Sequence, residues 1–285
     1  MIKNVDSENS ILIGRTIWCL SKLLCLVRND INYLSKIFDA VSQTMINKKS
    51  DLSIQLVSAQ CISIICQRLI SQKKEINSNY ITKDYDTLIE ILNKVNEDTR
   101  FIPIENLLYL TKLNKETSLY VPLHHLTPVL KIYAENFNDN YIGPKILELI
   151  KIWCEDKKSA HYLIDKFIPI AIKVFEDFYK KNIGKTDEVF EEVKNTVMTE
   201  HSNPDIKTSS DMLPNLIDII NMLIKYCKEN KDENNLMWIT LIVKSLCDIL
   251  LLSTDVTILQ HGCSLLRFYR ALCKETRWKK TDWSP

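Results

Sequence analysis

Residues 11–46 read ILIGRTIWCLSKLLCLVRNDINYLSKIFDAVSQTMI, and this stretch decides the fold. Its first half carries apolar residues at steps of four and three, which lie on one face of a helix. The members of this stripe are Ile13, Ile17, Leu20, Leu24 and Val27. After a short polar turn, in which Asp30 is a candidate N-cap, residues 31–46 repeat the pattern. The stretch therefore predicts a pair of helices joined by a short turn.

The same unit returns along the chain. The predicted helices that follow span residues 52–71, 85–95, 104–113, 123–137, 144–155, 160–181, 212–228, 234–252 and 256–274. First helices of each pair thus begin near 11, 52, 104, 144, 212 and 256. Paired helices with a period of about 40–47 residues are typical of HEAT and armadillo repeats. A hairpin cannot bury its apolar side alone, so neighbours must stack, and we predict an all-α fold, an α-α superhelix or solenoid.

The step from 144 to 212 is too long for one repeat, which indicates an insertion. We predict HEAT-like repeats over residues 1–182, a charged insertion loop over 183–210, and further repeats over 211–285. The insertion contains an acidic cluster made of Asp187, Glu188, Glu191 and Glu192. This cluster is either part of a solvated loop or an arm that contacts a basic partner, since long insertions in compact repeats are often functional.

Composition limits the class of protein. The net charge of +1 differs from the large positive excess of a nucleic-acid-binding protein, so we expect no direct nucleic-acid contact. Nine cysteines, an odd number without a C-x-x-C motif, fall mostly in apolar runs and predict reduced core residues. The N-terminus lacks a signal peptide, and the most apolar segment, 236–252, contains Lys244 and Asp248. We therefore predict a soluble protein that does not bind membranes.

No sequence motif points to a catalytic site. Phosphate-binding loops need closely spaced glycines, and no two of the four glycines lie within forty residues of each other. The adjacent pair His124-His125 would point about 100° apart on a helix, and no H-E-x-x-H motif exists, which predicts no metal site. Nothing nominates a nucleophile with its base. We predict a protein that is not an enzyme and has no cofactor.

Three tryptophans fall on helical stripes and are predicted in the core, namely Trp18, Trp153 and Trp238.

Three stretches of the chain match motifs of one protein superfamily. Residues 14–18, GRTIW, followed by Ser21-Lys22, are similar to G-R-x-x-W-x-x-S-[RK], which lies on the first helix of a central repeat in the importin-β (karyopherin) superfamily. Residues 57–59, VSA, running into Ile62, are similar to the start of the family's [IV]-S-A-x-x-[AC]-I. Residues 260–269, QHGCSLLRFY, are similar to its Q-x-G-x-x-x-L-R-x-Y. The stretches occur in the family's order and at a comparable separation, while residues 72–210 share only the repeat rhythm.

The resemblance implies a central segment of a nuclear transport receptor, a long superhelix of HEAT repeats. Such receptors move between cytoplasm and nucleus, carry basic proteins such as histones or ribosomal proteins, contact nucleoporins and respond to Ran-GTP. We expect a monomer in which the family's main Ran-binding repeats are missing, since these lie nearer its N-terminus. The family is usually acidic, which suits basic cargo, whereas this chain carries +1 and is expected to act mainly as a flexible spine. The alternative is a HEAT-repeat scaffold or regulatory subunit of a cytosolic complex.

Overall fold

The computed structural model describes residues 9–24, 30–74, 76, 79–113, 123–136, 139, 141–182, 204–232, 235–236, 239–240, 243–244, 247, 251 and 256–275. All regular secondary structure in these ranges is helical, which confirms the predicted all-α fold. The chain divides into two compact units, residues 1–156 and residues 157–285. Each unit is a stack of helices.

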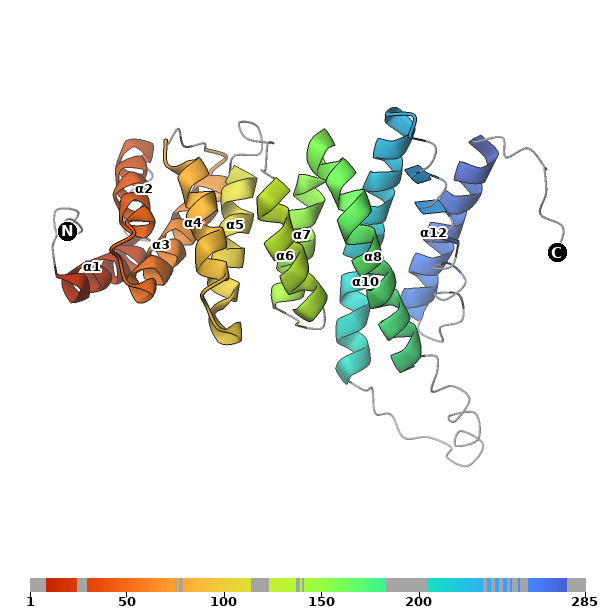
Figure 1. The fold of residues 1–285 in the computed structure, drawn as a ribbon, viewed down its shortest axis with the longest axis horizontal. Helices are drawn as coiled ribbons and strands as arrows, with labels where there is room; N and C mark the ends of the chain where they lie inside the picture. Colours follow the sequence, from red (N-terminus) through yellow and green to blue (C-terminus); the bar gives the residue numbers. More distant parts are fainter. Residues whose placement is uncertain are drawn as a thin grey trace, which may run out of the picture. The chain divides into compact units, whose positions relative to one another are not determined.

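Unit 1 is built from two layers of helices. Their bounds are α1 Ser10–Leu23, α2 Ile31–Ile46, α3 Leu52–Ser71, α4 Ile81–Leu92, the short 3-10 helix η3 Glu97–Thr99, α5 Phe101–Leu113, α6 Leu123–Asn136 and α7 Ile142–Trp153. One layer runs α1, α3, α5, α7, each helix in contact with the next, and the other runs α2, α4, α6 (Figure 1). Each helix of the second layer also packs on the next helix of the first layer along the chain. This alternation is the arrangement of a helical-repeat solenoid.

Side-chain caps start the first two helices. The Asn9 side chain accepts hydrogen bonds from the backbone N–H groups of Ile11 and Leu12. Asp30 does the same for the start of α2, as predicted. The helices then turn their apolar stripes inward, and the buried members in α2 include Leu34, Ile37, Phe38 and Val41.

Helix α3 occupies the centre of unit 1. It contacts α1, α2, α4 and α5, so it must be apolar on most of its circumference. Among the described residues it is the one helix whose length and composition would also suit a membrane span. Near its end, the Arg68 guanidinium donates a hydrogen bond to the carbonyl of Leu24, which satisfies a backbone group at the end of α1. These contacts place α3 against both layers of unit 1.

Unit 2 contains α8 Lys157–Asn182, α10 Pro204–Glu229 and α12 Val256–Glu275, with α10 in contact with both others. The helix predicted over 234–252 is helical at each of its described positions. Ile239, Val243 and Cys247 are buried there at the four-residue spacing of a core-facing stripe. Helix α10 begins at Pro204, so residues 204–210 are helical although we predicted them in the insertion loop. Proline is favoured at the first position of a helix, where its missing N–H costs no hydrogen bond.

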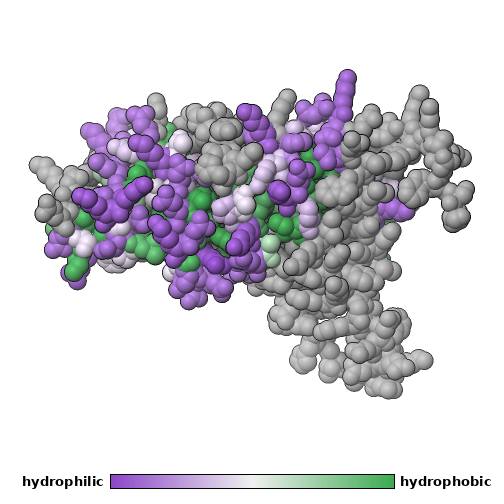
Figure 2. Space-filling view, in the orientation of Figure 1, coloured by the Kyte–Doolittle hydropathy of each residue, from purple (hydrophilic) through white to green (hydrophobic). Residues whose placement is uncertain are grey.

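Large side chains separate into an inner and an outer set. Trp153 is buried as predicted. The prediction for Trp18 was wrong, because 53% of this side chain is exposed. It follows Ile17 of the apolar stripe by one residue and so points about 100° away from the core. Trp238 lies outside the described residues. Figure 2 shows hydrophilic residues over most of the visible surface of unit 1, with hydrophobic residues between them.

The cysteines follow the predicted pattern with one clear exception. Those that are described and buried are Cys61, Cys66, Cys154, Cys227 and Cys247. Cys263 on α12 is exposed, and Cys19 is half-buried. None of these seven forms a disulfide. Most of the thiols therefore serve as small apolar side chains in the core, and Cys263 does not.

Candidate functional site

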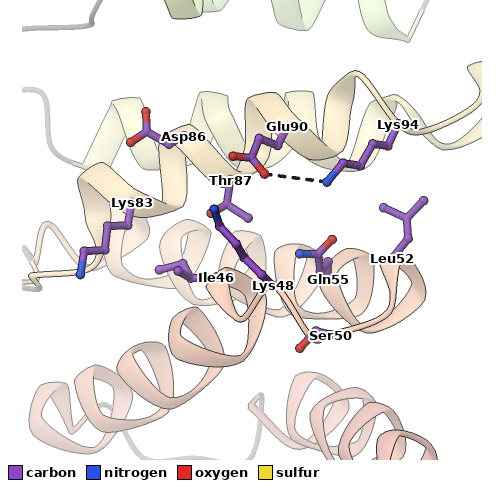
Figure 3. A pocket seen from close by; sticks show the side chains of 10 residues that line it. All are labelled: Ile46, Lys48, Ser50, Leu52, Gln55, Lys83, Asp86, Thr87, Glu90 and Lys94. Carbon is purple, nitrogen blue, oxygen red and sulfur yellow. Dashed lines mark ion pairs between the residues drawn. The ribbon is translucent and has the colours of Figure 1, made fainter.

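The acidic cluster proposed from sequence, Asp187, Glu188, Glu191 and Glu192, lies outside the described residues. The structure instead shows a polar groove in unit 1 with a volume of about 420 Å³. The groove runs between helix α4 and the segment that ends α2 and begins α3 (Figure 3). We call it the α4 groove. Its lining residues are Ile46, Lys48, Ser50, Leu52, Gln55, Lys83, Asp86, Thr87, Glu90 and Lys94.

One wall of the α4 groove is the turn over residues 47–51, which hydrogen bonds hold in place. Asn47 leaves the helical conformation and its side chain accepts a bond from the Lys49 N–H at 3.0 Å. The Ser50 hydroxyl donates to the Thr44 carbonyl at 2.9 Å, which satisfies one of the last carbonyls of α2. The Gln55 amide donates to the carbonyl of Met45 at 3.1 Å and joins α3 to α2. The turn is therefore a defined wall.

The other wall, α4, is attached to the neighbouring helices through consecutive residues. The Ser42 hydroxyl of α2 donates to the Asp84 carboxyl at 2.8 Å, in the buried interior. The Tyr85 hydroxyl lies 2.6 Å from the Thr111 hydroxyl of α5. Since that Thr111 hydroxyl donates to a backbone carbonyl one turn earlier, at 2.7 Å, Tyr85 is the donor in their shared bond.

The next residue, Asp86, reaches a third helix. The His125 ring of α6 donates from Nε2 to the Asp86 carboxylate at 2.7 Å. His125 is 1% exposed and stacks on the Tyr85 ring, with centroids 6.0 Å apart and planes at 16°. Consecutive helical residues point about 100° apart, so three in a row can reach three different neighbours. Residues 84–86, the 84–86 triplet, thus tie α4 to α2, α5 and α6.

Asp84 is a buried acid in an apolar setting. Burial raises the pKa of Asp84 to about 8, and the charge of Asp39 adds to this rise. The hydrogen bond from Ser42 acts in the opposite direction but is the smaller effect. The second carboxyl oxygen, Oδ1, has no hydrogen-bond partner. At pH 7 the folded protein therefore holds Asp84 mainly as a neutral acid.

Exposed charges surround the α4 groove. Lys83, Glu90 and Lys94 follow one side of α4, and Lys48 reaches from the turn toward this helix (Figure 3). Glu90 and Lys94 are 3.8 Å apart, one helical turn from each other, and more than half exposed. Ion pairs of this kind contribute only a few tenths of a kcal/mol. The lining thus contains three lysines against two carboxylates, a small positive excess.

The buried thiols of α3 and the buried phenol of Tyr85 are suited to packing. Burial raises the pKa of the Cys61 thiol to about 12 and that of the Cys66 thiol above its usual range, so neither is a thiolate at neutral pH. Burial likewise raises the pKa of the Tyr85 phenol. No three His, Cys, Asp or Glu residues of the described chain come together as metal ligands. What the arrangement offers is a surface that can bind another molecule through charge and hydrogen bonds.

Sequence reasoning missed the α4 groove, because its polar residues follow the spacing of a solvated helix face. One reason is a wrong helix start: the helix that we predicted from Tyr85 begins four residues earlier, at Ile81. Asp84 was therefore placed outside the helix, where a polar residue requires no explanation. On a helix that includes residue 81, Asp84 stands between Ile81 and Leu88 at steps of three and four, which is the spacing of one helix face and predicts a buried acid that needs a partner.

Comparisons with known proteins inform the fold only. No protein-family model and no curated protein matches the chain. An engineered protein solved by the Northeast Structural Genomics Consortium is similar over 95% of both chains, with a TM-score of 0.54 and 11% identity. A second engineered protein from this consortium covers 92% of this chain and 70% of its own, with a TM-score of 0.41 and 10% identity. The first similarity agrees with a helical-repeat fold, and at this identity it carries no information on function.

Proposed function

We propose that this chain is a segment of a nuclear transport receptor of the importin-β type. In this proposal the whole receptor carries basic proteins, such as histones or ribosomal proteins, between cytoplasm and nucleus. It contacts nucleoporins and responds to Ran-GTP. The segment itself serves as a protein-binding solenoid without catalysis.

The observation that carries the proposal is the order of three family-like stretches on helices of a layered repeat. Residues 14–22 belong to α1, residues 57–62 to α3, and residues 260–269 to α12. Helices α1 and α3 are neighbours in one layer of unit 1. Within the second stretch, Ser58, Ala59 and Ile62 are buried, so they supply packing between repeats. The burial of these three residues supports the resemblance, because packing between neighbouring repeats constrains such positions.

A pull-down with the full-length receptor that contains this segment tests the proposal, because the segment itself is expected to lack the main Ran-binding repeats. The receptor is immobilised, loaded with core histones, and then washed with Ran bound to GTP or, as the control, Ran bound to GDP. A receptor of this type should release histones in the GTP arm and retain them in the GDP arm. Equal histone retention in the two arms would count against the proposal.

The acidic cluster gives a second, more local test. If Glu188, Glu191 and Glu192 contact basic cargo, their change to Lys should weaken histone binding, most strongly at low salt where charges are least screened. Retained affinity at low salt would assign these residues to solvent. Because this test concerns only the insertion, it separates a failed cargo site from a failed receptor assignment.

A scaffold subunit of a cytosolic complex is the second candidate. The net charge of +1 and the lysines of the α4 groove favour it, since both are poorly suited to basic cargo. A scaffold should co-purify in fixed stoichiometry with an enzyme subunit and ignore Ran in either nucleotide state. Release of a bound partner by Ran-GTP would argue against this candidate.

A further inference from the structure

We propose that the α4 groove binds an acidic, extended peptide segment of a partner protein. This site is independent of the receptor proposal, because a basic cargo would meet lysines here. The partner is defined by its chemistry, a short run of Asp and Glu residues in extended conformation.

Charge complementarity is the first argument. Lys48 and Lys83 contact no carboxylate within the described part of the chain, so both ammonium groups are available to a ligand. The two carboxylates of the groove are already engaged: Glu90 faces Lys94 at 3.8 Å, and Asp86 accepts a hydrogen bond from His125 at 2.7 Å. An approaching acidic segment therefore meets uncompensated positive charge.

The spacing of the lysines selects an extended segment over a single anionic group. Among the described residues Lys83 is free, whereas Lys94 is compensated only weakly by its exposed pair with Glu90; the two lysines are eleven positions apart along α4 and its end, which corresponds to roughly 16 Å at 1.5 Å per residue. About five residues of extended peptide cover that length at roughly 3.3 Å each. A phosphate needs cations that converge on one point, and lysines this far apart cannot meet there. Several spaced carboxylates satisfy them better.

Neutral groups between the lysines can hold a peptide backbone. The Thr87 hydroxyl lies in the groove and makes no hydrogen bond with any described residue. The Gln55 amide donates one N–H to the Met45 carbonyl, so its second N–H and its oxygen remain for a ligand. A peptide backbone offers both donors and acceptors, so these groups can bind it in either direction. The 84–86 triplet and the hydrogen-bonded 47–51 turn hold both walls in place before a ligand arrives, which lowers the ordering cost of binding.

The test uses the full chain and a fluorescein-labelled hexapeptide of alternating Asp and Glu, followed by fluorescence anisotropy at low ionic strength. We expect saturable binding that weakens as salt is added. Lys48→Glu and Lys83→Glu should each weaken binding by roughly fivefold to tenfold, as expected for reversal of one exposed charge near its partner. Lys36→Glu is the matched control, because Lys36 is an exposed lysine of α2 outside the groove. Its affinity should stay within about twofold of the unmodified protein.

Circular dichroism of each variant tests whether the fold is retained. We expect that it is, because all three substituted lysines are exposed. Three results would overturn the proposal. The hexapeptide does not bind; Lys36→Glu weakens binding as much as the groove variants; or a neutral peptide with one phosphoserine binds more tightly than the acidic hexapeptide. The last result would replace the extended segment with a single phosphate as ligand.

Discussion

Replacing Asp84 with asparagine should alter how the stability of unit 1 depends on pH. The Asp84 side chain is fully buried, and its pKa is raised to about 8 in the folded protein. In the unfolded chain an aspartate titrates near about 3.9. Between these two values the folded state holds a proton that the unfolded state has lost. Stability therefore falls as pH rises through this window, and it levels off above the folded pKa.

The size of the effect follows from proton linkage. Each pH unit inside the window lowers the free energy of unfolding by about 1.4 kcal/mol, so the loss between about pH 5 and pH 7 is at most about 3 kcal/mol. Asparagine cannot ionise, and its oxygen can still accept the Ser42 hydrogen bond. Its amide N–H groups find no ready acceptor in that position, which costs about 1–2 kcal/mol at every pH. By the same linkage the unmodified protein has already lost about 1.5 kcal/mol between about pH 3.9 and pH 5, so Asp84→Asn should be about as stable as it near pH 5 and more stable by roughly 2–3 kcal/mol near pH 7.

Urea unfolding of the full chain, followed by far-UV circular dichroism at several pH values from 5 to 8, measures this divergence in stability. Glu90→Gln is the matched control, because Glu90 is an exposed carboxylate of the same helix. The stability difference between this control and the unmodified protein should not change with pH in that range. If the Asp84→Asn curve runs parallel to that of the unmodified protein, Asp84 is ionised in the fold and the reasoning about its burial is refuted.

Three further predictions concern other parts of the described chain. Gly14→Ala should raise the free energy of unfolding, measured in urea, by about 0.5–1 kcal/mol, because alanine favours helix and its Cβ would meet Ile54 of α3 at an ordinary 3.9 Å. A lower free energy of unfolding would show that α1 and α3 pack too closely for the added methyl group. Tyr85→Phe removes the 2.6 Å bond to Thr111 and should lower stability by about 1 kcal/mol in the same assay; an unchanged midpoint would show the bond contributes nothing net. Exposed Cys263 should react with a thiol reagent in the folded protein, whereas buried Cys61, whose pKa is raised to about 12, should react only after unfolding. Mass spectrometry maps the labelled thiols, and labelling of Cys61 under native conditions would contradict its burial.

The helices could be predicted because their apolar stripes are long and regular. The bounds of α2 and α3 agree with the predicted 31–46 and 52–71. Errors gathered at helix starts: α5 begins at Phe101 and α7 at Ile142, ahead of the predicted 104 and 144. Both helices have a proline in the first turn, where it leaves no backbone donor unsatisfied. We read polar or proline-containing first turns as loops, because periodicity becomes visible only once a second turn exists.

The α4 groove could not be predicted in the same way. Its walls come from residues 46–55 and 83–94, and only the fold brings the two segments together. Each segment alone has the pattern of a solvated turn or helix face. Trp18 shows a different error, because it stands one residue after Ile17 and therefore lies off the buried stripe of α1. Sequence pattern defines layers here, whereas contacts between layers decide where polar residues meet.

Polar contacts in the interior of unit 1 explain why α4 has one defined position. Apolar helix faces tolerate small rotations and shifts, since one leucine contact resembles the next. The 84–86 triplet removes that freedom, because a rotation of α4 would separate Asp84 from Ser42 and Asp86 from His125 and leave buried polar groups without partners. The protonated acid lowers stability at neutral pH, yet it orients the lysines on the outer side of the same helix. The proposed selection of a partner by the spacing of these lysines requires that orientation of α4. The loss of stability caused by the buried acid and the proposed binding surface therefore depend on the same helix.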